Sequence, residues 1–470
     1  MADNDRSTAV EVGRLRRTAP LVGLTARTAG EAVIHALRKR SRGPAAGAEF
    51  HARTADRYAQ LLGQSKGVLM KAGQMLSFVS LGTSIPEEYQ SLYRDALSRL
   101  QADAPPMAPE LAAATFEAEI GRHPGDVFAE FSYQPMAAAS IGQVHAARLP
   151  DGRKVAVKIQ YPGVEQAIRA DLQNDQLLTT FFSLLKSIVP GLTRWDMKAI
   201  AAEVAERITE EVDYLNEAAN QSYFADSYRG HPFIHVPDVI PELTTRRVLT
   251  QDLVEGMGWS EAVHADQALR DRWGEVIYRF AIGSLRRLDA FNADPHPGNY
   301  FFHSDGTVSF VDFGCVKRFN RHQVDLMCQM IIAVCHRDPD RFRQVWVDFG
   351  AVDAEGGPSA KAMFDWWSDT AEMLLGPQPY AMTREKVGVA IQREFSPIGP
   401  SGSVIRAINP PPDLVFLTRI DTGMMSILGE LRSTGYWRSI QAEFDEGAEP
   451  FTELGKAEQP FWEQRATSDA

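Results

Sequence analysis

The stretch "ADPHPGNYFFHSDGTVSFVDFG", residues 293–314, decides the fold of this chain. It contains two short apolar runs on either side of Ser304-Asp305-Gly306, a sequence typical of tight turns. The pattern therefore predicts a β-hairpin that turns at Asp305-Gly306. Polar residues that can carry chemistry stand at both ends of this hairpin.

Asp294 and Asn299 precede the hairpin and are separated by four residues, with two prolines stiffening the loop between them. Kinase catalytic loops place an aspartate, which is a base or orients the nucleophile, and a metal-binding asparagine at this spacing. Asp312 follows the hairpin in an Asp-Phe-Gly sequence. Magnesium prefers hard oxygen ligands and bridges phosphates, so Asn299 and Asp312 are predicted to be magnesium ligands.

The tetrapeptide "VDFG" occurs a second time, with its aspartate at Asp348. Here Asp338-Pro339 has the sequence of a helix start, and apolar residues follow at helical spacing. Gly350 stands where a C-cap glycine belongs. We interpret this copy as part of an amphipathic helix, with Asp348 on its surface and Phe349 in the core.

A second hairpin is predicted upstream, from Ile141–Leu149 and Lys154–Gln160 joined by Pro150-Asp151-Gly152. In "VAVKIQYP" the apolar residues alternate with Lys158, which therefore points to the opposite face of the strand. Lys158 is either an exposed strand lysine or a lysine that pairs the α- and β-phosphates of ATP and a helix glutamate.

Residues 200–222 predict one amphipathic helix. Its apolar face consists of Ile200, Val204, Ile208, Val212, Leu215 and Ala219. Glu211 falls inside that face, where a carboxylate needs a partner. Asp213 and Glu217 fall together on the opposite face, either solvated or functional.

The composition excludes some classes of protein. The formal net charge is −12, which argues against nucleic-acid binding. Residues 1–42 are basic, with nine Lys or Arg against four Asp or Glu, and this segment is a solvated tail, a contact for an anionic membrane surface or an intramolecular clamp on the acidic remainder of the chain. The three cysteines are expected to be reduced, and neither a signal peptide nor a membrane-spanning helix is predicted. We expect a cytoplasmic protein, peripheral at the inner face of the membrane if the basic segment binds there.

These motifs resemble the UbiB/AarF/ADCK family of atypical, protein-kinase-like proteins, over roughly residues 60–330. "LMKAGQMLS" is similar to the family's Lys-x-Gly-Gln signature, and "AAASIGQVH" to its alanine-rich loop. "EEVDYLNEAAN" is similar to its Glu-x-Asp element and helix glutamate, and "DPHPGN" to its catalytic loop. The resemblance implies an α+β, bilobal kinase-like fold that binds ATP or ADP with Mg²⁺.

The resemblance also implies a role for each matching residue. Lys158 and Glu217 would form the nucleotide-positioning ion pair, and Asp294 would be the catalytic-loop aspartate. The remaining expected nucleotide contacts are Ala137, Ala138, Ala139, Ser140, Asp252 and Val254. The expected regulatory residues are Lys71, Gly73 and Gln74, on a helix that in the family lies over the active site, and Glu211 and Asp213, whose carboxylates would meet Lys71.

The expected layout has four parts. Residues 1–50 form the basic segment and linker, 51–125 a helical extension, 126–256 the small β-rich lobe and 257–470 the helical lobe. The implied function is an atypical kinase or ATPase that supports synthesis of isoprenoid quinones or related lipids. The alternative is a weakly active, nucleotide-binding scaffold of a membrane-associated complex that contacts a quinone-precursor lipid. Oligomeric state is open.

Overall fold

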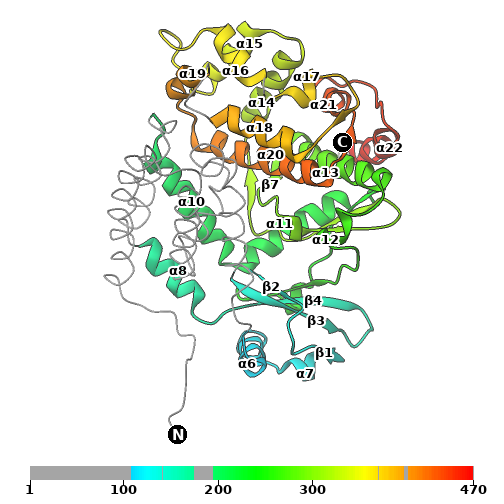
Figure 1. The fold of residues 1–470 in the computed structure, drawn as a ribbon. Helices are drawn as coiled ribbons and strands as arrows, with labels where there is room; N and C mark the ends of the chain where they lie inside the picture. Colours follow the sequence, from blue (N-terminus) through cyan, green and yellow to red (C-terminus); the bar gives the residue numbers. More distant parts are fainter. Residues whose placement is uncertain (1–106, 140, 174–193, 369, 396–400, 469–470) are drawn as a thin grey trace, which may run out of the picture. The chain divides into compact units, whose positions relative to one another are not determined.

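The computed structural model describes residues 107–139, 141–173, 194–368, 370–395 and 401–468 (Figure 1). The part of the predicted helical extension that precedes residue 107, and with it Lys71, Gly73 and Gln74, lies outside the described residues. The described chain divides into two compact units. The N-terminal unit comprises the residues before 174 together with Met197–Tyr214 and Pro241–Thr250, and the C-terminal unit comprises the rest.

A five-stranded sheet organises the N-terminal unit. Its strands lie in the order β1-β3-β4-β6, with β2 also paired to β3. Their bounds are β1 (Glu130–Phe131), β2 (Ala137–Ala138), β3 (Gly142–Arg148), β4 (Lys154–Gln160) and β6 (Val248–Asp252). Strands β3 and β4 form the predicted antiparallel hairpin, and Gly152 in its turn has a φ of 92°.

In strand β4 the alternation of residue types corresponds to the two faces of the sheet. Val155, Val157 and Ile159 are fully buried, whereas Lys158 is partly exposed on the other face, as predicted. The first residue of β3 is Gly142, and a larger residue would not fit, because a Cβ there would lie 2.2 Å from the backbone oxygen of Ile159. The unit is completed by the helices α6 (Pro109–Ile120), α7 (Pro124–Val127), α8 (Val164–Leu172) and α10 (Met197–Glu211) and by a short 3₁₀ turn, η2 (Pro241–Leu243).

The predicted continuous helix over 200–222 is wrong, because the chain breaks between α10 and α11 (Tyr214–Tyr228). The side-chain amide of Gln160 donates to the backbone oxygen of Val212, and the backbone N–H of Tyr214 donates to the backbone oxygen of Arg246. In a continuous helix these two backbone groups would bond within the helix. Here they bond instead to Gln160 of the sheet and to Arg246. The helical phase changes at the break: Leu215 is 46% exposed and Glu217 is only 2% exposed, the reverse of the prediction.

The C-terminal unit contains the second predicted hairpin. Strands β8 (Tyr300–Phe302) and β9 (Val308–Phe310) are antiparallel, and β5 (Ile234–His235) pairs with β9 in parallel. Strands β7 (Ala290–Asn292) and β10 (Val316–Arg318) form a separate antiparallel pair that the sequence did not indicate. Both predicted hairpins are therefore confirmed.

Helices make up most of this unit. In chain order they are α12 (Trp259–Ala262), α13 (Gln267–Leu288), α14 (Arg321–Cys335), α15 (Pro339–Asp348), α16 (Ala360–Ser368), α17 (Glu372–Leu375), α18 (Arg384–Phe395), α19 (Gly402–Ala407), α20 (Pro412–Leu431), α21 (Trp437–Asp445) and α22 (Glu453–Ser468), with a short 3₁₀ turn, η3 (Pro297–Asn299), and a two-residue strand pair, β11 (Tyr380–Ala381) and β12 (Thr434–Gly435). The long helices α13 and α20 pack side by side (Figure 1). Aromatic side chains of α13 and the hairpin share one core, in which Phe280 stacks on Phe310.

The second "VDFG" copy lies at the end of α15, as predicted. The side chain of Asp338 caps the helix by accepting from the backbone N–H of Arg341, and Gly350 follows it with a φ of 73°. Asp348 is exposed and accepts a hydrogen bond from Gln344. Phe349, predicted to lie in the core, is only partly buried. This aspartate is a surface helix residue.

All three cysteines are free, and burial raises the pKa of Cys328 and Cys335 to about 11. These two thiols are therefore protonated and unreactive near neutral pH. In the described residues, no helix is long and apolar enough to cross a membrane.

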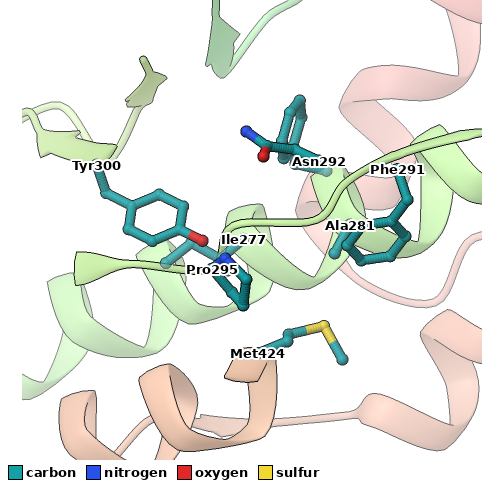
Figure 2. Close-up of a pocket in the computed structure, with 8 residues that line it drawn as sticks. Ile277, Ala281, Phe291, Asn292, Pro295, Tyr300 and Met424 are labelled. Carbon is teal, nitrogen blue, oxygen red and sulfur yellow. The ribbon is translucent and has the colours of Figure 1, made fainter. Parts of the chain in front are cut away.

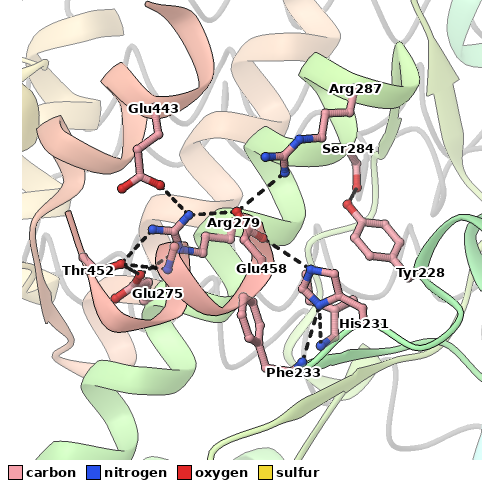
Figure 3. Close-up of polar contacts among 12 residues, drawn as sticks. Tyr228, His231, Phe233, Glu275, Arg279, Ser284, Arg287, Glu443, Thr452 and Glu458 are labelled. Carbon is pink, nitrogen blue, oxygen red and sulfur yellow. Dashed lines mark hydrogen bonds and ion pairs between the residues drawn. The ribbon is translucent and has the colours of Figure 1, made fainter. Parts of the chain in front are cut away.

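A buried ionic network joins α13 to the C-terminal helix α22 (Figure 3). The Arg279 side chain is fully buried and lies 2.7 Å from carboxylate oxygens of Glu275 and Glu443 and 2.9 Å from one of Glu458. Glu458 also contacts the Nε2 atom of His231 at 3.3 Å. A buried charge is tolerated only when paired, so this network fixes the position of α22.

The network holds His231 in its neutral form. Nδ1 accepts from the backbone N–H of Ile234, which leaves Nε2 as the donor to Glu458. Burial lowers the pKa of His231, and the carboxylate of Glu458 offsets this only in part. Burial would raise the pKa of Glu458, but His231 and the arginines outweigh it, and that pKa is lowered.

We predict that His231 makes the chain less stable in mild acid. A folded-state pKa below the unfolded value of 6.5 means that its contribution is present above pH 6.5 and is lost as the pH falls. The lowered pKa of Glu458 also makes the folded state less stable as the pH falls, but only below the ordinary pKa of 4.5. The measurement is urea unfolding of the wild type and of His231→Gln from pH 7.5 to 5.

The difference in unfolding free energy between these two proteins should shrink as the pH falls, and a constant difference would contradict the assignment. Glu453→Gln is the control. It removes a carboxylate that is 87% exposed and paired with Lys456, so it should change stability by less than about 0.5 kcal/mol at any pH.

Candidate catalytic loop and phosphate-binding residues

The catalytic-loop candidate, residues 293–299, is closed by the β7–β10 pair. Strand β7 leads into the loop and β10 follows the Asp-Phe-Gly sequence, and the backbone N–H of Ala293 donates to the backbone oxygen of Cys315 at 2.7 Å. Asn292, the last residue of β7, makes two further bonds. Its Oδ1 accepts from the backbone N–H of Asp294 at 3.2 Å, and its Nδ2 donates to the backbone oxygen of Asp312 at 3.0 Å.

The Asp294 carboxylate is held from two sides. Its Oδ1 lies 3.0 Å from the Nη2 atom of Arg419 on α20, and its Oδ2 lies 3.5 Å from the Nδ2 atom of Asn299. The same Asn299 amide donates to the backbone oxygen of Asp294 at 3.1 Å. These contacts orient both residues, since each side chain is bonded to fixed neighbours.

Asp312 has a φ of 69°, in the left-handed region that non-glycine residues rarely adopt. Its Oδ1 accepts from the backbone N–H of Gly314 at 3.1 Å, a local bond that stabilises this conformation. The backbone N–H of Val311 donates to the backbone oxygen of Asn299, so the hairpin ladder brings Asn299 and Asp312 to the same end. Backbone strain of this kind is found at functional sites.

Phe313 anchors the Asp-Phe-Gly sequence. Its ring is fully buried and lies 4.9 Å from that of Phe224 on α11. The side chain of Asn220, one turn earlier on α11, donates to the backbone oxygen of Phe313 at 3.3 Å. Asp312 is therefore carried on a segment packed into the core.

The donor set fits magnesium bound together with a nucleotide. No group of three or more His, Cys, Asp or Glu residues in the described ranges is placed to hold a metal ion by itself. Asn299 and Asp312 instead lie at the same end of the hairpin, and each has a side chain that carries oxygen. Mg²⁺ in phosphate-transferring enzymes commonly takes one or two such ligands and completes its shell with phosphate oxygens and water.

A small cavity of about 20 Å³ lies directly under the loop (Figure 2). Apolar side chains of α13, Pro295 and Met424 of α20 line it, together with Asn292 and Tyr300. Burial, with a smaller effect of the Asp294 charge, raises the pKa of Tyr300, so its hydroxyl stays protonated. The cavity holds about one water molecule, so it is a gap in the packing and not a ligand site.

The phosphate-binding candidates of the N-terminal unit lie on β2, β3 and β4. The Nζ atom of Lys158 lies 5.0 Å from the centroid of the Tyr214 ring, which is fully buried. Ala137 and Ala138 form β2 and are exposed, and the backbone N–H of Ala139 donates to the backbone oxygen of Gly142. The alanine-rich sequence thus forms β2 and leads towards β3, and Ser140 lies outside the described residues.

The remaining predicted residues are placed as follows. Glu217 is buried on α11, where a carboxylate requires a partner, and its ion pair with Lys158 stays a prediction. Asp252 ends β6 and Val254 follows it, both partly buried. Glu211 ends α10, and Asp213, in the break, lies 3.3 Å from the Arg246 side chain.

Three residues of the site were missed by sequence reasoning. Asn292 interrupts an apolar run directly before the loop, and this polar position was an available signal. Tyr214 is one residue beyond the Glu-x-Asp element, but its contact with Lys158 depends on the helix break. Arg419 is separated from Asp294 by 125 positions in sequence, and no local pattern links them.

Comparisons with known proteins indicate the family of this chain. A family model described as the ABC1 atypical kinase-like domain matches residues 99–346, just over half of the chain. Among curated proteins, the chloroplastic Protein ACTIVITY OF BC1 COMPLEX KINASE 8 of Arabidopsis thaliana is 34% identical over 282 residues, which cover 59% of this chain and 36% of that protein. The "Probable serine/threonine-protein kinase abkA" of Dictyostelium discoideum is 28% identical over 403 residues, 81% of this chain and 68% of that protein.

Among solved structures, Rv3197 of Mycobacterium tuberculosis, determined in complex with erythromycin, is similar with a TM-score of 0.60 and 29% identity. The similarity covers 85% of this chain and 97% of Rv3197. This chain spans between about a third and a half of the length of the first curated relatives that it matches. The α+β architecture and these matches confirm the predicted bilobal kinase-like fold, and the chain belongs to the UbiB/AarF/ADCK family of ABC1 atypical kinase-like proteins.

Proposed function

We propose that this chain binds ATP or ADP with Mg²⁺ and transfers the terminal phosphoryl group of ATP to water or to another acceptor. The observation that carries the proposal is the catalytic loop, in which Asn292 bonds to the backbone of both Asp294 and Asp312. The family membership supports a kinase-like activity. The physiological role that we propose is support of isoprenoid-quinone or related lipid synthesis.

In the proposed reaction the residues have distinct tasks. Asp294 orients the attacking oxygen and accepts its proton, while the bond from phosphorus to the leaving oxygen breaks and the bond to the attacking oxygen forms. Asn299 and Asp312 would hold magnesium, which would neutralise phosphate charge when bound. Lys158 and Glu217 orient the nucleotide phosphates.

The alternative is a nucleotide-binding scaffold with little chemistry of its own. Both functions require nucleotide binding, but only the enzyme requires that Asp312 support turnover. Phosphate release therefore discriminates between them, measured with and without lipid or quinone-precursor mimics.

Asp312→Asn should lower magnesium-dependent phosphate release about 100-fold or more, because a negative metal ligand is lost while side-chain size is kept. Asp348→Asn is the matched control, since it changes the same tetrapeptide at an exposed helix position. It should leave turnover unchanged. Equal turnover of the wild type and Asp312→Asn would disprove the assignment of the metal ligand.

Ala139→Gly should change the ratio of ATP affinity to ADP affinity. The alanine side chain at position 139 limits the backbone conformations with which N–H groups can surround phosphates. Glycine at the same position would make these conformations accessible. Calorimetric titration of both nucleotides with Mg²⁺ measures the ratio. An unchanged ratio would show that this position does not select between the nucleotides.

The basic N-terminal segment is proposed to contact anionic membranes. Each Lys or Arg close to such a surface contributes about 1 kcal/mol, and residues 1–42 carry five more basic than acidic residues. Removing them should reduce co-sedimentation with phosphatidylserine vesicles but not with neutral phosphatidylcholine vesicles. Undiminished co-sedimentation would eliminate this contact.

A further inference from the structure

Helix α20 contacts the catalytic loop at two points one helical turn apart. The Arg419 side chain lies 3.0 Å from the Asp294 carboxylate. Four residues later, a Cβ on Gly423 would lie 2.2 Å from the Cγ atom of Pro295. Residues four apart share one face of a helix, so the loop rests on a single face of α20.

This contact lies outside the part of the chain that matches the family model. That match ends at residue 346, whereas α20 spans Pro412–Leu431. No motif in the sequence singles out α20, and none of the catalytic roles assigned above uses it. It is therefore a separate element that reaches the most reactive segment of the site.

Arg419 supplies a positive charge that the catalytic loop itself lacks. Within residues 290–299 the basic side chain is His296, which is exposed and whose Nδ1 accepts from the backbone N–H of Gly298. A permanent positive charge next to Asp294 thus comes from α20. An arginine beside a carboxylate fixes its orientation through a directional hydrogen bond that both charges strengthen.

The position of the guanidinium is not explained by packing. The Arg419 side chain is 11% exposed, and its Nη1 atom is buried without a hydrogen-bond partner among the described residues. A buried N–H that lacks a partner destabilises the fold, so an apolar side chain of similar length would serve the packing at least as well. The arginine is placed for what its other nitrogen does at Asp294.

We propose that Arg419 is a positioning residue for phosphoryl transfer, which holds the Asp294 carboxylate in the orientation that faces the nucleophile. Gly423 serves the same end, because its missing side chain admits Pro295 and sets the distance between loop and helix. The inference rests on the proposed function, but the seating of the loop on α20 can be measured independently of turnover.

The test compares Arg419→Met and Arg419→Lys with the wild type in two assays: magnesium-dependent phosphate release, and hydrogen exchange of peptides covering residues 290–300. Arg419→Met should lower kcat about 10- to 100-fold, as expected for a misplaced catalytic group, with nucleotide affinity retained. Its urea midpoint should be unchanged or higher, and loop exchange should be faster. Arg419→Lys, which keeps the charge, should recover part of kcat.

Two matched controls separate these effects from damage to the helices. Arg384→Gln removes an exposed arginine 3.7 Å from Glu430 at the other end of α20, and it should change neither kcat nor loop exchange. Gly423→Ala should lower kcat and speed loop exchange, whereas Gly388→Ala on α18, where a Cβ meets nothing within 4 Å, should be neutral.

Wild-type kcat in Arg419→Met would overturn the inference while leaving the proposed function intact. So would a loss of kcat in Arg419→Met that is matched by a lower urea midpoint and not recovered by lysine. If the wild type releases no phosphate, the proposed function fails. Unchanged loop exchange in Arg419→Met would then overturn the seating of the loop as well, and faster exchange would support it.

Discussion

A single side-chain amide, that of Asn292, ties the two acidic residues of the candidate site together. It accepts from the backbone of Asp294 and donates to the backbone of Asp312, so the loop and the Asp-Phe-Gly segment cannot move independently without breaking a bond. The β7–β10 pair fixes the position of Asn292 itself. Asp312, whose backbone oxygen Asn292 holds, has a left-handed backbone, and Asn299 bonds to the backbone of Asp294, the other residue that Asn292 contacts.

Local patterns were sufficient to predict the parts of the fold that are built from neighbouring residues. Both hairpins, the alternation around Lys158 and the capped helix α15 follow from turn chemistry and periodicity within short windows. The helix over 200–222 failed because Gln160 and Arg246, distant in sequence, bond to its backbone at the break. The spacing of apolar residues indicates which residues share one face of a helix. It does not predict where hydrogen bonds from distant segments end that helix.

The candidate site shows the same division. The spacing of Asp294, Asn299 and Asp312 could be read from the sequence because one hairpin and the loop directly before it bring all three together. Arg419 could not, because its contact with Asp294 joins positions 125 residues apart. The two "VDFG" copies make the point most simply, since the same four residues follow a hairpin at Asp312 and end an amphipathic helix at Asp348, which is exposed. In both cases the surroundings of a residue decide its chemistry.

The central claim is that Asn299 and Asp312 form the metal side of a nucleotide site beside an oriented Asp294. The most direct measurement is a crystal structure of the full chain with ADP and Mn²⁺, in which anomalous scattering locates the metal. The account predicts a metal ion about 2 Å from side-chain oxygens of Asn299 and Asp312 and bonded to a phosphate oxygen, with Asp294 still paired to Arg419. A nucleotide-bound metal ion that contacts neither Asn299 nor Asp312 would contradict it.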